Sequence, residues 1–279
     1  MKSEYYNRKA GTMMGKYKSE EEMLENYDAN KYKTPDGYTS DIAVFTIIST
    51  EVEKHKPPVK ELKLMLIQRA AKDAEGEPNV EGSKWALPGG FVQPDETAFE
   101  AASRELEEET GVTNLKMKHF GTYDKPGRDK RAWIISNAHY AIVPENQLVK
   151  RKAADDASDV QLFNLEEISQ LELAFDHQQI ISDAIWIIKK DMALTTLAKN
   201  FLPKEFVLSE LQGVLLTVLD DSWIKLDSQF FRKAPSLPFI EKVMDEGELK
   251  KSNRWSKNKA QLYRFTDFEP FVSIYNANY

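Results

Sequence analysis

The chain has 279 residues, of which 41% are hydrophobic and 30% charged, a composition that suits one large globular domain or two ordinary ones. It contains no cysteine, which excludes a disulfide framework and a thiolate metal site. The stretch MKSEYYNRKAG at the N-terminus lacks an apolar signal core, and no run approaches the roughly 18 apolar residues of a membrane span. We therefore expect a cytoplasmic protein without a membrane partner.

The net charge of −7 is unevenly distributed along the chain. Residues 201–279 contain equal numbers of acidic and basic residues, so the acidic excess lies before them. Within 248–264 a single acid, Glu248, accompanies a run of basic residues: Lys250, Lys251, Arg254, Lys257, Lys259 and Arg264. A globally acidic chain does not bind polyanions unspecifically as a whole, but this local stretch could bind one.

The first two hundred residues alternate between strand and helix patterns. Residues 1–38 are polar and read as an extension with one short helix at 20–27. Apolar runs rich in β-branched residues predict strands at 41–49, 62–70, 114–124, 131–144 and 160–165. Helices are predicted at 97–110 and 175–193. The alternation predicts an α/β fold.

A boundary is expected near 200–203, and the pattern changes after it. Ser209 is a good N-cap for a helix over 209–220, and a second helical stretch covers 227–233. We expect two or three helices here, the third being 239–247, which stops at Gly247. Residues 248–265 then resemble two strands joined by a basic hairpin. Two or three helices followed by a basic β-hairpin is the element order of a winged helix.

The helix over 97–110 carries an acidic face. Positions i, i+3 and i+4 share one side of a helix, so Glu105, Glu108 and Glu109 fall within about 100° of one another. The stripe of Phe99, Ala102 and Leu106 should pack on the sheet, while Glu100 and Glu107 point to water. Gly111 follows as a C-terminal helix stop.

Three carboxylates on one face repel one another unless a cation lies between them, and hard oxygen ligands suit Mg²⁺. A glutamate-rich helix is more often a solvated surface than a metal site. Here Arg104 precedes Glu108 by four residues, a spacing that allows the two side chains to pair.

This segment resembles the signature of the Nudix hydrolases, G-x5-E-x7-R-E-U-x-E-E-x-G-U, where U is a bulky aliphatic residue. All nine fixed positions match: Gly90, Glu96, Arg104, Glu105, Leu106, Glu108, Glu109, Gly111 and Val112. The resemblance implies that Glu105, Glu108 and Glu109, with Gly90 beside them, hold Mg²⁺ or alternatively Mn²⁺. It assigns the catalytic group to Glu105 and Glu109, with Arg104 and Glu96 orienting the acids. The general base is Glu105, Glu109 or an acid from a later loop, namely Glu145, Asp155 or Asp156.

The remaining chain, over about 40–265, resembles one branch of this family, in which a C-terminal winged helix follows the Nudix domain. Members of this branch either regulate NAD metabolism as sensors of ADP-ribose or hydrolyse ADP-ribose. The resemblance implies a Nudix α/β/α sandwich with a mixed sheet, then a smaller winged-helix domain, and a homodimer. The expected divisions are an extension at 1–38, a Nudix domain at 39–200 and the winged helix at 201–279. Pro235 and Pro238 shorten the helix that would read DNA.

The first hypothesis is a Mg²⁺-dependent pyrophosphohydrolase acting on ADP-ribose or a similar nucleoside diphosphate derivative, which the intact signature favours. The second is an ADP-ribose-responsive regulator that binds duplex DNA, and a weaker third is a house-cleaning hydrolase of nucleoside triphosphates. Candidate substrate contacts are Arg69, Arg128 and Arg131. A structural ion pair explains Arg69 equally well, and for Arg128 and Arg131, which flank a loop where related regulators receive ligand, a role without ligand contact is the more frequent one. Candidate DNA contacts are Arg232, Lys233, Lys257 and Lys259. His177 is better explained by helix-end packing than by catalysis, and Trp85 by the core than by base stacking.

Overall fold

The structure, a computed structural model, describes residues 17–73, 75–113, 116–145 and 160–270. The chain divides into two compact units, Met1–Asp36 and Gly37–Tyr279. In the first unit, helix α2 (Glu20–Glu25) begins after Ser19, whose hydroxyl accepts a hydrogen bond from the amide of Glu22. The short helix predicted at 20–27 is therefore confirmed, although it ends two residues earlier.

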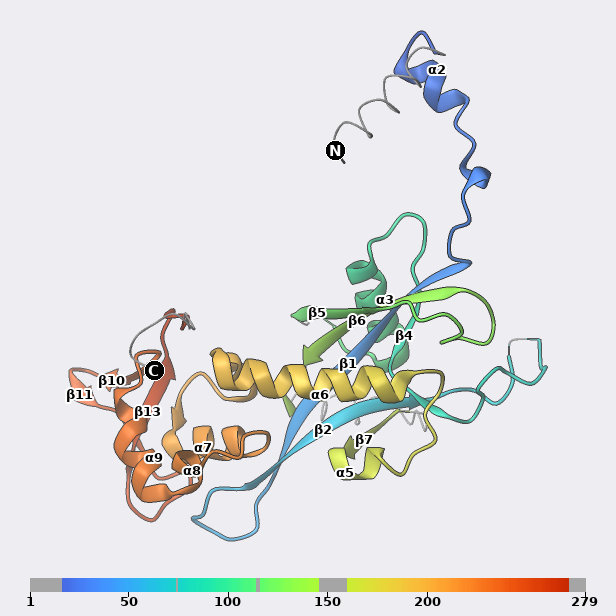
Figure 1. Cartoon of the computed structure of the whole chain (residues 1–279). Helices are drawn as coiled ribbons and strands as arrows, with labels where there is room; N and C mark the ends of the chain where they lie inside the picture. Colours follow the sequence, from blue (N-terminus) through green and yellow to red (C-terminus); the bar gives the residue numbers. More distant parts are fainter. Residues whose placement is uncertain (1–16, 74, 114–115, 146–159, 271–279) are drawn as a thin grey trace. The chain divides into compact units, whose positions relative to one another are not determined.

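The second unit is built on a seven-stranded mixed sheet (Figure 1). Its strands are β1 (Gly37–Thr50), β2 (Val59–Gln68), β3 (Trp85–Ala86), β4 (Gly89–Phe91), β5 (Met117–Tyr123), β6 (Ile134–Ile142) and β7 (Val160–Asn164). The central strand β1 runs antiparallel to β2 and β4 and parallel to β6, which makes the sheet mixed. Each predicted strand is present, with ends that differ by a few residues; β1 and β2 begin before their apolar runs, because pairing with the neighbouring strands extends over polar residues as well.

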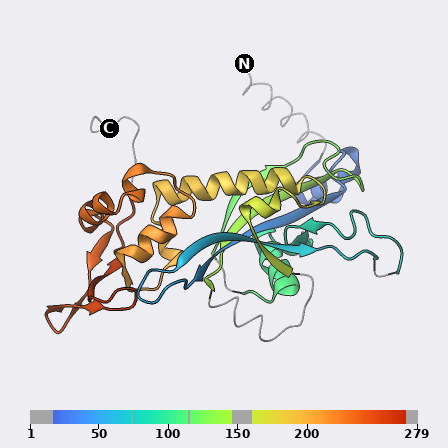
Figure 2. The ribbon, with the colours of Figure 1, turned by 90° about the horizontal axis from the view of Figure 1, so that it is seen from below.

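Alternate residues of β1 face opposite sides of the sheet, and each side has its own helix. Ile42 and Val44 pack in one cluster with Ala102 and Leu106 of α3 (Ala98–Thr110). The other face packs against α6 (His177–Leu194). This second cluster contains Ala43 and Phe45 of β1, Leu64 and Leu66 of β2, and Ile180, Ala184 and Ile188 of α6. Figure 2 shows α3 and α6 on opposite sides of the sheet, which gives the expected α/β/α sandwich.

The C-terminal part has the strand and helix order of a winged helix. Its elements are η2 (Leu197–Phe201), β8 (Phe206–Val207), α7 (Leu208–Leu216), α8 (Ser222–Lys225), α9 (Asp227–Lys233), η3 (Ala234–Ser236), β9 (Ile240–Lys242), β10 (Met244–Asp245), β11 (Glu248–Leu249), β12 (Lys251–Ser252) and β13 (Ala260–Phe265). Strand β13 pairs with β8, β9 and β12, so the segment between β9 and β13 projects as the wing. As predicted from Pro235, α9 ends at Lys233 and a short 3-10 turn replaces its continuation.

Two expectations about single elements are wrong, and a third holds only in part. Ser209 does not cap α7, because the helix begins at Leu208 and the amide of Val207 donates to the Glu210 carboxylate. The third helix at 239–247 is absent, since this segment forms β9 and β10 and turns back into β11. The predicted packing of Phe99 on the sheet is only partial: its ring lies edge-on to His139 of β6 at 6.2 Å but is 46% exposed, and Ala101 takes the buried position beside Ala102.

A single hydrophobic core joins the sheet, α6 and the C-terminal helices. It includes Ile188 and Met192 of α6 together with Phe206, Leu211 and Phe230. The division at residue 200 remains a prediction, because residues on its two sides share this core. Among the described residues, no helix is long and apolar enough to cross a membrane.

Candidate active site

Helix α3 is fixed at both ends by its local sequence. The Thr97 hydroxyl accepts from the amide of Glu100, whose carboxylate accepts in return from the amide of Thr97. Gly111 ends the helix with φ 65°, a left-handed conformation that glycine adopts without strain. Glu107 is exposed on the outer side, as predicted. These caps set the rotation that turns Glu105 and Glu109 toward β4.

The two inner carboxylates lie against the glycine pair of β4. The Glu109 carboxylate accepts a 2.8 Å hydrogen bond from the amide of Gly89. Any Cβ added at Gly90 would overlap the Glu105 carboxylate, so only glycine allows this approach. The Glu105 carboxylate therefore lies directly against the main chain of Gly90, and we call this arrangement of carboxylate and main-chain oxygen the glycine cradle.

Arg104 organises the remaining acids. Its guanidinium contacts Glu96 at 2.7 Å, Glu105 at 2.6 Å and Glu108 at 3.2 Å, and it also donates to the main-chain oxygen of Phe91. The predicted pairing with Glu108 is confirmed, although the Glu108 side chain is 59% exposed. The hydrogen bonds from Arg104, followed by the amide of Gln93, hold the pKa of Glu96 below its ordinary value.

The Glu109 carboxylate is half-buried beside β4. Burial is the main cause that raises its pKa to about 8; the hydrogen bond from the Gly89 amide lowers the pKa, and the neighbouring carboxylates of Glu105 and Asp41 raise it. A divalent cation would reverse this effect, because it favours the ionised carboxylate. In the part of the chain that the structure describes, no three acids already converge as a metal-ligand set, since Arg104 holds Glu105 and Glu108. The donors and the glycine cradle fit a hard cation once that guanidinium yields.

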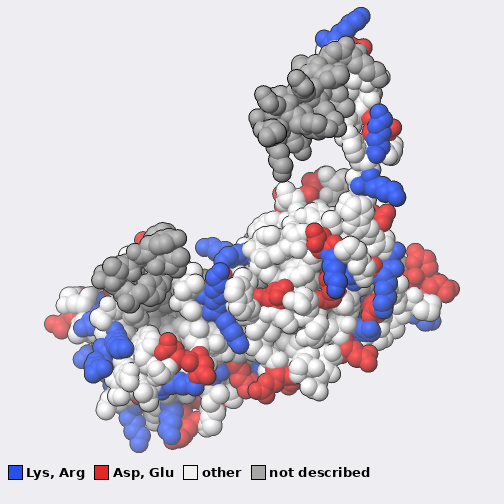
Figure 3. Space-filling view, viewed as in Figure 1, with Lys and Arg blue, Asp and Glu red and all other residues white. Residues whose placement is uncertain are grey.

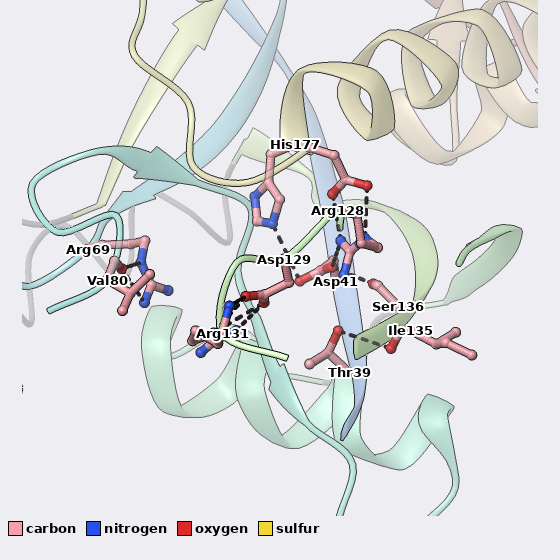
Figure 4. Close-up of polar contacts among 11 residues, drawn as sticks. Thr39, Asp41, Arg69, Val80, Arg128, Asp129, Arg131, Ile135, Ser136 and His177 are labelled. Atoms are coloured by element: carbon pink, nitrogen blue, oxygen red, sulfur yellow. Dashed lines mark hydrogen bonds and ion pairs between the residues drawn. The ribbon is translucent and has the colours of Figure 1, made fainter. Parts of the chain in front are cut away.

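The candidate substrate arginines gather beside this face (Figure 4). Arg69 follows β2 and donates Nε and Nη2 to the main-chain oxygen of Val80. Burial, and then the charge of Arg131, lower the pKa of Arg69, while Glu109 raises it. Arg131 pairs with Asp129 at 2.7 Å. Its guanidinium and that of Arg69 both lie over the ring of Phe175.

Arg128 differs from the other two because it is almost fully buried. It forms a two-point ion pair with Asp176 at 2.6 and 2.8 Å and lies 3.9 Å from Asp41. These contacts favour the ion-pair explanation for Arg128 over direct ligand contact. Its edge still borders a cavity of about 360 Å³, which Lys84, Lys125 and Phe175 also line.

His177 is a structural residue, as predicted. Its Nδ1 accepts a 2.9 Å hydrogen bond from the amide of Leu87, which requires the neutral ring with the proton on Nε2. Burial lowers the pKa of His177. Trp85 also has the predicted core role, with its ring edge-on to Phe163 at 4.8 Å.

The sequence did not predict a buried polar network that lies beside the acidic face of α3. Asp41 accepts from the Ser136 hydroxyl, and its carboxylate lies 3.9 Å from both Arg128 and His177 (Figure 4). The available signal was an acid at the start of the apolar run DIAVF, because a buried carboxylate needs partners. The partners come from β6, the loop that precedes it and α6, so their identity is not visible locally.

Glu145, one of the acids proposed as an alternative base, does not join this site. Glu145 accepts from the amide of Ser49, eight residues along β1 from Asp41 and thus about 26 Å away. Asp155 and Asp156 lie outside the described residues.

The candidate DNA residues are all exposed. Arg232 and Lys233 lie in the last turn of α9, and Lys257 and Lys259 lie just before β13. Figure 3 shows Lys and Arg side chains over the face where the C-terminal elements lie in Figure 1.

Other basic residues of the wing are already paired. Lys250 contacts Glu205 at 2.8 Å, and Arg264 contacts Glu241 at 2.7 Å. Arg254 lies 3.4 Å from the buried carboxylate of Glu210, which also accepts from the indole of Trp255.

Comparison with known proteins agrees with this arrangement. The family profile described as NUDIX domain matches residues 43–184. The ADPR responsive transcriptional repressor NtrR of Acinetobacter baylyi is 28% identical over 251 residues, 89% of each chain. An ADP-ribose pyrophosphatase of Methanocaldococcus jannaschii is 39% identical over 124 residues, 44% of this chain and 66% of that protein. The crystal structure of Shewanella oneidensis NrtR complexed with a 27mer DNA matches at a TM-score of 0.59 and 25% identity, covering 82% of this chain and 93% of the other. The chain belongs to the Nudix family.

Proposed function

We propose that this protein hydrolyses the pyrophosphate bond of a nucleoside diphosphate derivative of the ADP-ribose type, with Mg²⁺ or Mn²⁺ as cofactor. The observation that carries the proposal is the approach of Glu105 and Glu109 to the Gly89–Gly90 pair, with Arg104 and Glu96 holding the acidic face in order. The similarity to an ADP-ribose pyrophosphatase over the catalytic region supports this substrate class.

Glu105, Glu108 and Glu109, together with the main-chain oxygen of Gly90, would hold the cation. When bound, it neutralises charge on the phosphate oxygens during attack by water. Glu96 keeps Arg104 beside the acidic face, and Arg104 holds Glu105 and Glu108 until a cation takes its place. Glu105 or Glu109 accepts the proton of the attacking water, because each lies on the face that meets the phosphates.

One experiment tests both the proposed substrate class and the third hypothesis, hydrolysis of nucleoside triphosphates. ADP-ribose, NAD, diadenosine polyphosphates and nucleoside triphosphates are each incubated with the full chain and Mg²⁺, and the products are resolved by chromatography. We expect AMP and ribose 5-phosphate from ADP-ribose, and no product in EDTA. Turnover of triphosphates alone would contradict the proposed substrate class.

A second candidate function is regulation of transcription by binding duplex DNA. It is favoured by the similarity over 89% of the chain to a repressor described as ADPR responsive, which extends through the winged-helix segment. We propose that residues 39–200 form the Nudix domain and residues 201–279 the DNA-binding domain. Arg232 and Lys233 would approach base edges, and Lys257 and Lys259 the phosphates. A homodimer would present two such surfaces to a two-fold symmetric site.

The two functions can coexist in one chain. An electrophoretic mobility titration against genomic duplex fragments at low salt, with and without ADP-ribose, tests the second. We expect binding that ADP-ribose changes. If no fragment is retarded under either condition, the C-terminal part is a packing module attached to an enzyme.

A further inference from the structure

Two guanidinium groups of the site share one aromatic ring. The Cζ atoms of Arg69 and Arg131 lie 5.0 and 4.8 Å from the centroid of Phe175. Arg131 also lies 5.4 Å from the centroid of Phe91, on the strand that holds Gly89 and Gly90. Aromatic rings attract cations through their faces, so Phe175 holds both groups beside the acidic site.

Stacking of this kind leaves hydrogen-bond donors free. A ring contacts the flat face of a guanidinium group, whereas the N–H bonds point out from its edge. Arg69 uses only Nε and Nη2, both on the oxygen of Val80. Within the described ranges no carboxylate lies in ion-pair distance of Arg69, unlike Arg104, Arg128 and Arg131. Its half-buried charge is therefore available to an incoming anion.

The backbone at Phe175 indicates that the ring position is imposed by its surroundings. Its φ of 51° lies in the left-handed region, which is unfavourable for an aromatic residue. The preceding Ala174 is tied to Trp85 by a main-chain hydrogen bond, and Asp176 is held by Arg128. Strain that persists between such fixed points is frequent where a side chain serves a ligand.

We propose that Phe175 is a positioning residue that holds Arg69 and Arg131 as a paired clamp for the diphosphate of the ligand. This inference rests on the proposed function, since it concerns the same site. Arg69 and Arg131 use Nε and Nη2 on Val80 and Asp129, which among the described residues leaves Nη1 of each arginine to donate to a phosphate oxygen. The clamp supplies positive charge independently of the cation, so the diphosphate binds before or without metal.

The test measures affinity in EDTA by calorimetry, with the full chain and two probes, ADP-ribose and inorganic pyrophosphate. Phe175→Leu removes the ring and keeps an apolar side chain, and Phe175→Met is a second variant of similar volume. We expect either variant to lower the affinity for both probes about five- to tenfold, the effect of losing a partly desolvated cation–π contact. Phe175→Tyr, which keeps the ring, restores affinity. Phe120→Leu removes a half-buried ring that packs on the core beside Tyr123 and Tyr140, with no arginine over it among the described residues, and serves as the matched control.

A double-mutant cycle separates positioning from packing. In the background Arg69→Gln/Arg131→Gln, Phe175→Leu should cause no further loss of affinity, because the groups it positions are gone. An equal further loss in that background would overturn the clamp, as would wild-type protein that binds neither probe in EDTA. If pyrophosphate binding depends on Phe175 but ADP-ribose is not hydrolysed with Mg²⁺, the clamp stands and the proposed enzymatic function falls. If ADP-ribose is hydrolysed with a KM that Phe175→Leu leaves unchanged, the enzyme stands and the clamp falls.

Discussion

At the residue scale, the difference between Glu109 and Glu107 shows how one helix can carry two kinds of carboxylate. Glu109 is buried against Gly89, whereas Glu107 points to water. Glu109→Gln keeps the shape but removes the charge on which a cation depends. We expect kcat/KM for ADP-ribose to fall by about 10²-fold or more, the usual cost of losing a catalytic electrostatic or proton-transfer group.

Glu107→Gln is the matched control, and its kcat/KM should stay within about twofold of wild type because surface charge contributes little. Equal losses in the two variants would mean that the acidic face is assigned to the wrong side of α3.

His177 predicts how stability responds to acid. Its neutral Nδ1 accepts from Leu87, and burial lowers the pKa of the folded state below that of the unfolded chain. Asp41 and Asp176 oppose this shift, whereas Arg128 and Arg69 add to it. The unfolded chain therefore binds the proton first, and stability falls as the pH drops below about 6.5, by at most about 1.4 kcal/mol per pH unit from this residue.

Denaturant unfolding at several pH values measures that slope. His177→Asn retains an acceptor for the Leu87 amide and cannot titrate, so its stability should depend less on pH between about 5 and 7. An unchanged slope would assign the acid sensitivity to other groups.

Local spacing predicted the acidic face of α3, because Glu105, Glu108 and Glu109 occupy one side of a single helix. The exposed position of Phe99 was not predictable in the same way, since the stripe could rotate by one residue onto Ala101. The roles of Phe175 and Asp41 were not predicted for another reason. Their partners lie on segments far apart in sequence, and only the folded sheet brings those segments together.

At the element scale, the segment 239–247 is the informative failure. Its charged and apolar spacing suggested a helix, but Glu246 and Gly247 both have positive φ, 49° and 86°, between paired strands β10 and β11. Two such residues form the type I′ turn of a tight hairpin, which Asn-Gly marks more clearly than Glu-Gly does.

Glu246→Asn should therefore stabilise the protein by up to about 1 kcal/mol, because asparagine adopts the left-handed conformation more readily than glutamate. Asp245→Asn, one residue earlier in the extended strand β10, removes the same charge without this relief. Thermal unfolding of both variants checks the prediction. A gain in Asp245→Asn equal to that in Glu246→Asn would point to charge rather than backbone strain.

At the scale of the whole molecule, α6 connects the candidate active site with the C-terminal elements. It begins at His177, beside Asp41, and its far end packs with Phe206 and Leu211 in the common core. The sequence located the change of pattern near residue 200 but not this shared packing, because a buried contact between two regions has no local signature. A ligand at the candidate active site and DNA at the wing would therefore bind two regions that share one hydrophobic core.

The proposed DNA-binding role of the wing can be tested at its basic residues that form no ion pair among the described residues. Lys257 and Lys259 are exposed, with no ion pair among the described residues, so they are suited to phosphate contacts that carry no sequence information. Replacing both by alanine should weaken binding to every duplex and reduce the salt dependence, the slope of log K against log salt, by about 2. Arg264→Ala is the matched control, because Glu241 already neutralises that guanidinium, and its slope should hardly change.

Arg232 should behave differently from these lysines. It lies in the last turn of α9, where a contact would reach base edges rather than phosphates. Arg232→Ala should reduce the preference for a specific palindromic site by about 1–3 kcal/mol while leaving binding to unrelated duplexes nearly intact. Fluorescence anisotropy against a selected site and a scrambled duplex, over a range of salt, measures both effects. A loss that is the same for the two duplexes would make Arg232 a phosphate contact, and α9, cut short before Pro235, would then lack a reading role.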